Sequence, residues 1–191
     1  MKSEGRGAGN HNGRERAVGA CKLLNQLWAD IKVAEDLMDF LAKVPNDGKY
    51  LGSEEDLVSL GRMVLSHLVL VLAKLGEVHR HYSKILPEGC QRESKALKME
   101  CEARRVPEFR NSVVGHVLGR ELKCPMTVEE VEALSLKVTK GDREAFSQWL
   151  RNPAELSDRS TVMGKVEWIL HTTMAAYQIT AEELGLHDSR G

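Results

Sequence analysis

The feature that most constrains the fold is a long series of apolar residues at helical spacing within residues 54–84. Its members recur every three or four positions, and they are Leu57, Leu60, Val64, Leu68, Val71, Leu75, Val78 and Tyr82. This period belongs to one face of an α-helix, whereas a half-buried strand alternates every two residues. The segment SHLVLVLAKL within it is apolar nearly all round. We therefore expect a helix buried on two faces, either by the protein's own helices alone or also by a second subunit.

The rest of the chain also has helical periodicity, interrupted by loops rich in Pro, Gly, Asn and Asp. The other predicted helices cover residues 13–43, 91–105, 107–121, 128–138, the stretch from Asp142 to Leu150, and a last long helix carrying Val162, Val166, Ile169, Thr173 and Tyr177. The chain is 42% hydrophobic but only 5% aromatic, a balance that favours helices over strands. The sequence thus predicts an all-α, up-and-down bundle of about five to seven helices.

A length of 191 residues suits one domain, which we place at 13–186. The Gly-rich, apolar-poor residues 1–12 and the short segment 187–191 are predicted to be disordered tails. No window approaches the roughly 18 uninterrupted apolar residues of a membrane span, and the N-terminus lacks the apolar centre of a signal peptide. We therefore expect a cytoplasmic protein without a membrane partner.

The four cysteines, Cys21, Cys90, Cys101 and Cys124, are irregularly spaced, without a CxxC pair or histidines at metal-ligand intervals. This pattern predicts reduced thiols and no metal or other cofactor. The two histidines of the HRH sequence at 79–81 point away from each other on a helix, so we interpret them as surface or edge residues.

The near-neutral net charge of −1 conceals an uneven distribution along the chain. Residues 79–123 contain 10 lysines and arginines against 6 acidic residues, whereas residues 124–191 contain 7 against 11. A basic segment in a neutral protein indicates either a polyanionic partner or a solvated helix face.

The stretch VPEFRNSVVGH, at 106–116 in this basic segment, brings Arg110, Asn111 and His116 together just after a proline. A neutral imidazole can take a proton from a ribose 2′-hydroxyl, and the charged form can return one to the leaving 5′-oxygen. Arg110 can stabilise the charge that grows on the phosphate, and Asn111 can orient the phosphate or the histidine. Such a site cleaves RNA without a metal, because the 2′-hydroxyl is its nucleophile.

On a regular α-helix, Arg110 and His116 are separated by about 120°, so the two side chains do not converge automatically. Two copies of the helix facing each other would line a shared cleft, so this spacing also favours a homodimer. Arg104, Arg105 and Arg120 flank the motif and are candidate RNA-binding residues that would contact phosphates without reading bases.

The sequence FRNSVVGH, late in a helical chain, resembles the motif of the HEPN superfamily: an arginine, a polar residue and a histidine a few positions on. The resemblance is nearest to abortive-infection-like HEPN proteins, and its specific part is confined to Arg110, Asn111 and His116. It implies a dimeric endoribonuclease with a composite cleft, used in phage defence or toxin–antitoxin systems, often beside a nucleotidyltransferase-like antitoxin. The predicted helices at 128–150 are additional to a minimal four-helix core of that family.

A bland interpretation of the same residues stays open. Arg110 then pairs with Glu108 or Glu102, Asn111 is an ordinary first-turn polar residue, and His116 is bonded to a carbonyl at the edge of the core. The sequence therefore supports two functional hypotheses: a HEPN-type endoribonuclease that acts as a toxin or defence effector, and a non-catalytic HEPN-fold module that binds RNA or protein.

Overall fold

The computed structural model describes residues 7–43, 53–114 and 128–186 of the chain. These residues form seven α-helices, one π-helical and one 3-10 segment, and no strand. In chain order the elements are α1 (Gly7–Lys43), α2 (Glu54–Tyr82), α3 (Glu88–Ala103), α4 (Val106–Phe109), η1 (Arg110–Val114), α5 (Val128–Thr139), α6 (Arg143–Leu150), α7 (Val162–Tyr177) and η2 (Glu182–Leu184). The predicted all-α bundle is confirmed.

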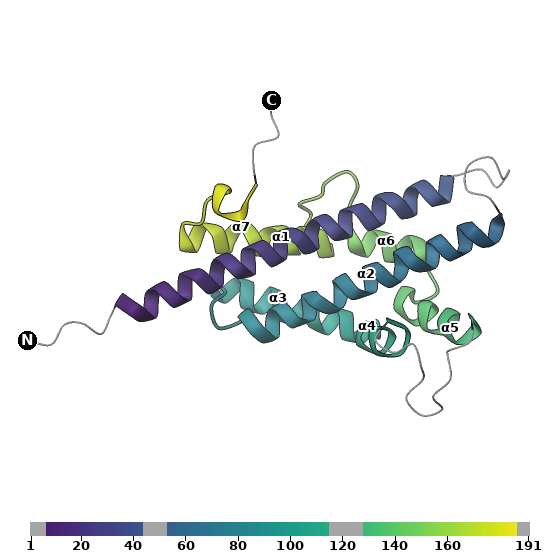
Figure 1. The fold of residues 1–191 in the computed structure, drawn as a ribbon, viewed down its shortest axis with the longest axis horizontal. Coiled ribbons are helices and arrows are strands. Elements are labelled where there is room, and N and C mark those ends of the chain that lie inside the picture. Colours follow the sequence, from purple (N-terminus) through teal and green to yellow (C-terminus); the bar gives the residue numbers. More distant parts are fainter. Residues whose placement is uncertain (1–6, 44–52, 115–127, 187–191) are drawn as a thin grey trace, which may run out of the picture.

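Four helices enclose most of the core. The long helices α1 and α2 run side by side, α3 packs against α2, and α7 packs against both α1 and α3 (Figure 1). The short helices α4 and α5 lie beside the outer side of α2, and α6 connects α5 to α7 (Figure 1). One contiguous apolar cluster runs through this arrangement.

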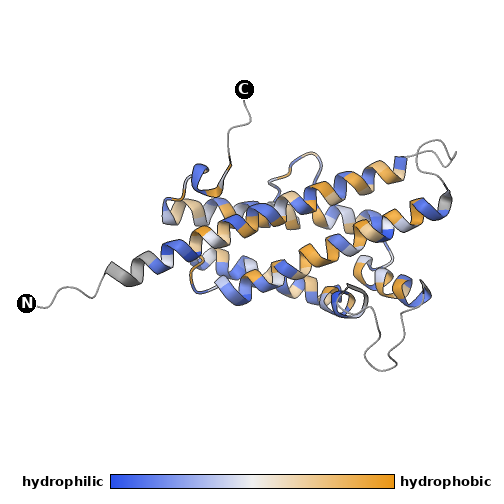
Figure 2. Ribbon diagram, in the orientation of Figure 1, coloured by the Kyte–Doolittle hydropathy of each residue, from blue (hydrophilic) through white to orange (hydrophobic). Residues whose placement is uncertain are grey.

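The prediction that α2 is buried on two faces is confirmed, and the burial comes from the chain's own helices. Figure 2 shows the concentration of apolar residues in the middle of α2, which contacts α1, α3, α4 and η1. The side chains buried there are Val64, Leu68, Val69, Val71, Leu72, Ala73 and Leu75. By length and composition alone, Glu55–Tyr82 is also apolar enough to cross a membrane. The apolar circumference of α2 therefore gives no separate argument for a second subunit.

Helix α1 begins earlier than predicted, because Gly7 to Asn12 are helical rather than disordered. Extending an existing helix adds a hydrogen bond for each residue fixed, so the Gly-rich segment continues a helix stabilised further along. Arg14 anchors that part of α1 by donating to Glu183 Oε2 at 2.9 Å and to the Gln178 carbonyl at 3.3 Å. The predicted tail at 187–191 and residues 1–6 lie outside the described residues.

The helix starts that the sequence predicts at Ser53 and Asp142 are confirmed. Ser53 forms a capping box with Asp56 at the start of α2, and Asp142 caps α6 by accepting from the Ala145 amide at 2.9 Å. The sequence also predicts a capping box of Thr127 with Glu130, and Thr127 lies outside the described residues.

The start of α7 depends on a glycine. The preceding turn passes so close to the helix that a Cβ at Gly164 would lie 2.0 Å from the Asp158 carbonyl oxygen. Only glycine permits this approach, which positions Thr161 to cap α7 through the Gly164 amide at 3.2 Å.

Three of the cysteines are free, as predicted, and the structure buries them: Cys21 on α1 and Cys90 and Cys101 on α3. Burial raises the pKa of the Cys21 thiol to about 11 and that of the Cys101 thiol to about 12. Cys124 lies outside the described residues.

Candidate functional site

The candidate site begins where the chain leaves α3 and turns into α4. Arg105 makes this turn with a left-handed backbone, at φ 58°, and Pro107 occupies the first turn of α4. Val106 and Phe109 are buried, and they fix α4 against the bundle. The proline fits there because its missing N–H has no partner in the first turn of a helix. The core contacts of α4 thus determine where the following residue, Arg110, emerges.

The motif does not continue as a regular α-helix. Residues Arg110–Val114 form the π-helical segment η1, so the prediction of one α-helix over 107–121 is confirmed at its start, in α4, and wrong for residues 110–114. Asn111, Ser112 and the β-branched Val113 and Val114 are poor α-helix formers, and η1 is held against α2. A π-turn bonds i to i+5, so the angular separation expected for a regular α-helix does not apply here. Single π-turns frequently occur at functional sites.

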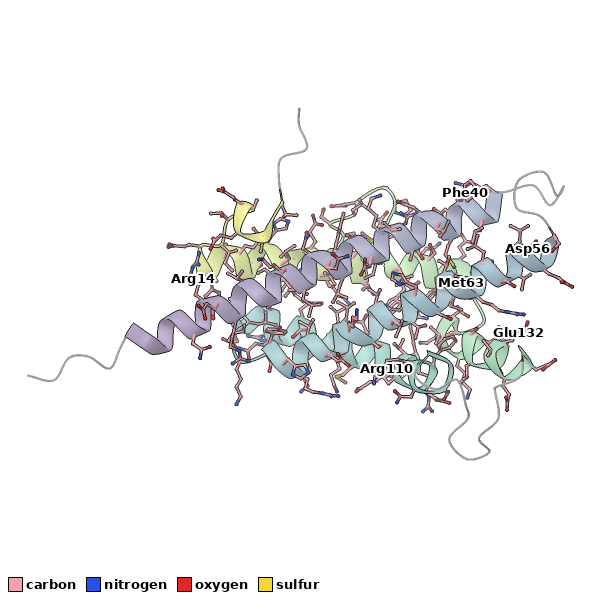
Figure 3. The ribbon with its side chains drawn as sticks, in the orientation of Figure 1. Arg14, Phe40, Asp56, Met63, Arg110 and Glu132 are labelled. Carbon is pink, nitrogen blue, oxygen red and sulfur yellow. The ribbon has the colours of Figure 1, made fainter. Side chains whose placement is uncertain are left out.

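The Arg110 guanidinium is held by two neighbours. Its Nη1 donates to Glu77 Oε1 on α2 at 2.8 Å, and its Nε and Nη2 donate to Asn111 Oδ1 at 3.2 and 3.1 Å. The Arg110 side chain is 35% exposed and that of Glu77 is 40% exposed. The guanidinium is therefore oriented by the protein yet partly exposed to solvent. Figure 3 labels the position of Arg110 in the bundle.

The two acidic partners considered for Arg110 in the bland interpretation bind other cations. Glu108 accepts from Lys137 at 3.1 Å, and Glu102 pairs with Lys98 at 2.8 Å. Arg110 instead reaches a carboxylate on a different helix, so this contact joins η1 to α2.

Two predicted site residues cannot be placed beside Arg110. His116 and Arg120 both lie outside the described residues. Among the predicted catalytic residues, the structure brings together Arg110 and Asn111.

The flanking arginines differ from each other. Arg104 stacks over the Trp149 ring, with its Cζ 4.2 Å from the ring centroid, and donates to the Val138 carbonyl at 3.1 Å. It therefore joins α3 to α5 and α6, and the predicted contact with a phosphate would compete with these interactions. Arg105 is exposed, and its one ion pair among the described residues is that with Glu108 at 3.9 Å, so it stays available as a phosphate contact.

This arrangement can bind an anion. A guanidinium fork suits a phosphate, and its orientation by Glu77 and Asn111 reduces the freedom lost on binding. An incoming phosphate would replace or share the contact with Glu77, which is exposed enough to turn away. Among the described residues, no three histidine, cysteine or acidic side chains are grouped so that they could hold a metal ion.

A second charged cluster was not anticipated from the sequence. Arg151, at the end of α6, donates to Asp36 and Asp39 at 2.6 Å each, and its Nε lies 3.7 Å from Glu35 Oε2. Glu35 is 1% exposed and accepts from the Ser147 hydroxyl at 2.6 Å. Glu35 lies on the same helix face as the apolar positions 31, 34 and 38. An acidic residue within that apolar series could have indicated a buried charged cluster.

The structure also contains an apolar cavity of about 550 Å³ between the end of α1, the start of α2 and α5. Its polar lining includes Arg62, which is paired with Glu132 at 3.3 Å, and Arg143. The apolar lining consists of Met38, Leu41, Ala42, Leu57, Val58, Leu65 and Leu136. None of the described residues of the motif lines this cavity, so the molecule has two distinct candidate sites.

Comparison with known proteins gives no further assignment. No protein-family model matches the chain, and no similar curated protein or solved structure is found. The fold and the geometry around Arg110 therefore carry the functional argument.

Proposed function

We propose that this protein is a metal-independent endoribonuclease of HEPN type that acts as a toxin or defence effector. His116 takes the proton of a ribose 2′-hydroxyl, and the 2′-oxygen attacks the adjacent phosphorus. The bond from phosphorus to the 5′-oxygen breaks, and the imidazolium returns its proton to that oxygen. The products are a 2′,3′-cyclic phosphate and a 5′-hydroxyl.

In this proposal Arg110 stabilises the negative charge that develops on the non-bridging phosphate oxygens. Asn111 holds the guanidinium in place through its Oδ1, which is a positioning role. Arg105 and Arg120 are proposed as phosphate contacts, and Arg104 is left out because its guanidinium is stacked on Trp149.

One observation carries the proposal. The motif arginine emerges at a π-helical turn with its guanidinium oriented by Glu77 and Asn111 and still accessible. A solvated surface arginine needs neither an irregular backbone nor a partner on another helix. A buried structural arginine would be enclosed, as Arg151 is.

The test is cleavage of mixed-sequence RNA in excess chelator by the purified chain. We expect products with cyclic phosphate ends, and no cleavage of a substrate whose 2′-hydroxyls are all replaced by hydrogen. His116→Ala should abolish the reaction without lowering the melting temperature. Cleavage that survives in proportion to folded His116→Ala protein would refute the proposal.

We also propose a homodimer in which both copies of the motif line one cleft, with a nucleotidyltransferase-like antitoxin as a further partner and the cytoplasm as the location. The family resemblance supports this dimer, whereas the angular separation of a regular α-helix gives it no support because Arg110–Val114 form a π-turn. Light scattering at micromolar concentration tests the dimer. A monomer that cleaves RNA at full rate would show that one chain is sufficient.

A second candidate function is a non-catalytic HEPN-fold module that binds a protein partner. The apolar cavity favours it, together with the exposed side chains of Val58 and Leu136 in its lining. The exposed side chain of Met63 lies at the same end of the bundle (Figure 3). In that case Met63→Lys would abolish binding of the protein partner, whereas substitutions of Arg110 would leave that binding unchanged.

A further inference from the structure

Helices α2 and α3 run antiparallel and meet at a close seam. A Cβ at Gly76 would lie 3.8 Å from Lys98 Cγ, and one turn further along α2 the Nδ1 of His79 lies 2.9 Å from Ser94 Oγ. Progress along α2 from 76 to 79 thus corresponds to progress backwards along α3 from 98 to 94. This pairing determines which surface residues of the two helices lie beside each other.

Cationic side chains gather along this seam. Arg80 follows Gly76 by one turn on the same side of α2, and Lys84 lies just beyond the end of α2, in the turn that leads to α3. On α3, Lys95 precedes Lys98 by one turn, which places it beside Arg80 in the antiparallel pairing. Arg80, Lys84 and Lys95 are exposed. We name Arg80, Lys84, Lys95 and Lys98 the basic seam.

The carboxylates near the basic seam are already paired. Glu102 binds Lys98 at 2.8 Å, and Glu77 binds Arg110 at 2.8 Å. The other carboxylates of α3 are also paired: Glu88 with Arg92, Glu93 with Arg159 and Lys165, and Glu100 with Lys165. Among the described residues, Arg80, Lys84 and Lys95 have no carboxylate partner, so their charge faces the solvent.

The histidine beneath the seam reports the same positive environment. Burial lowers the pKa of His79, and the nearby charges of Lys98 and Lys95 lower it further. A cluster of like charges without counter-ions is unfavourable by itself, and it becomes favourable when a polyanion binds.

The basic seam is continuous with the candidate active site. Glu77, which holds Arg110, is the residue next to Gly76, and Gly76 marks the point where Lys98 crosses α2. The cations thus extend from Arg110 along α2 for about 10–15 Å, at 1.5 Å per residue.

We propose that the basic seam binds the phosphate backbone of single-stranded RNA and leads it to Arg110, an inference that rests on the endoribonuclease function proposed above. Three of the four side chains of the seam are lysines, which contact phosphates as point charges, and none is an aromatic ring on which bases stack. Binding along it is therefore independent of sequence and strongly dependent on salt.

The test measures binding of a fluorescent, 2′-O-methylated RNA of about 20 nucleotides, which the chain cannot cleave because the 2′-hydroxyl is blocked. Arg80→Glu with Lys95→Glu should weaken binding at least tenfold near 0.1 M salt. The slope of log affinity against log salt should become shallower by about 0.7 for each phosphate that the variant no longer neutralises. The milder pair, Arg80→Gln with Lys95→Gln, should weaken binding less, in the same direction.

A matched control reverses two exposed lysines of α1, Lys22→Glu with Lys43→Glu, and so changes the net charge by the same amount. It should weaken binding by no more than about threefold, since long-range charge is screened beyond about 10 Å at this salt. Equal weakening by the control and the seam variant, with both folded by circular dichroism, would overturn the proposal.

Further arms separate the seam from the endoribonuclease function. Single-stranded DNA should bind through the seam as the RNA does, because both offer phosphates, but it should not be cleaved. If the chain binds RNA through the seam but never cleaves it, the proposed endoribonuclease function is refuted and the proposed RNA binding by the seam is supported. If the charge-reversed seam variant cleaves RNA at the full rate, the proposed role of the seam in RNA binding is refuted and the proposed endoribonuclease function is supported. Vesicles of anionic lipid that bind through the seam when RNA does not would reassign it to a membrane surface and refute the RNA proposal.

Discussion

Two arginines of this protein each hold carboxylates on another helix, and they differ mainly in burial. Arg151 closes α6 against α1, grips Asp36 and Asp39, and has a side chain that is 9% exposed. Arg110 joins η1 to α2 through Glu77, and its side chain is 35% exposed. The ion-pair chemistry is the same in both. The buried guanidinium of Arg151 stabilises the fold, whereas the partly exposed guanidinium of Arg110 can exchange its carboxylate partner for a ligand.

The surroundings of the partners reinforce this contrast. Glu35 beside Arg151 is almost fully buried, and its Oε1 has no hydrogen-bond partner among the described residues. Burial raises the pKa of Glu35 above its ordinary value, although the Ser147 hydrogen bond and Arg151 act in the opposite direction. In the part of the chain that the structure describes, no comparable buried carboxylate pairs with Arg110. Stability should therefore depend on the Arg151 cluster, and activity on Arg110.

The largest expected effect is on stability. Arg151→Ala removes the cation from a nearly buried carboxylate, and we expect the free energy of unfolding to fall by about 3–5 kcal/mol. Urea denaturation followed by circular dichroism measures it. As a control, Lys32→Ala breaks the exposed pair with Asp36 at 2.6 Å and should change stability by less than about 1 kcal/mol. Equal effects of the two variants would show that burial does not distinguish Arg151.

The next effect is on the reaction. Arg110→Ala should lower the rate of RNA cleavage by about a hundredfold or more, because a transition-state charge loses its partner. Its free energy of unfolding should change by less than about 1 kcal/mol, since the pair with Glu77 is half exposed. Single-turnover cleavage in chelator, measured beside urea denaturation, checks both. A variant that loses stability and keeps its activity per folded molecule would assign Arg110 to the fold.

A third prediction concerns pH. The pKa of Glu35 in the folded chain lies above its ordinary value of 4.5. The folded chain therefore holds more protons than the unfolded chain above pH 4.5, and this group makes the free energy of unfolding fall as the pH rises through the folded pKa.

Glu35→Gln should remove that decline. The difference between wild-type and variant unfolding free energies, measured from about pH 5 to 8, isolates it from other titrating groups. The lowered pKa of Asp36 acts in the opposite sense, but only below about pH 3.8. Parallel curves for the two proteins would mean that Glu35 ionises freely in the fold.

The smallest expected effect is that of Glu77→Gln. It removes the charge that competes with phosphate for Arg110 and keeps a hydrogen-bond acceptor, so KM for RNA should fall by a few fold with kcat little changed. Stability should move by less than about 1 kcal/mol. A loss of kcat as large as that of Arg110→Ala would show instead that the Glu77 carboxylate is needed to orient the guanidinium.

Much of the fold was accessible from the sequence because helix periodicity and capping are local. The stripe of α2, the loops between helices and the caps at Ser53 and Asp142 all depend on residues a few positions apart. The prediction placed the start of α1 too late. Each glycine there has a low helix propensity, but extending a helix that already exists is easier than starting one.

The candidate site was less accessible because its contacts are distant in sequence. The alternative interpretation paired Arg110 with Glu108 or Glu102, whereas its partner Glu77 lies 33 positions earlier. The π-turn arises where η1 is pressed against α2, which no local pattern encodes. The stacking of Arg104 on Trp149 likewise requires α3 and α6 to be adjacent.

The buried cysteines have a further consequence for measuring how this protein opens. With the thiol pKa of Cys21 near 11 and that of Cys101 near 12, almost no thiolate forms at neutral pH, and no reagent reaches the sulfur in the folded chain. In a chain carrying Cys124→Ser, alkylation of these thiols would proceed only through opening of α1 or α3. The labelling rate at each cysteine then measures how often that helix separates from the bundle, without any added probe.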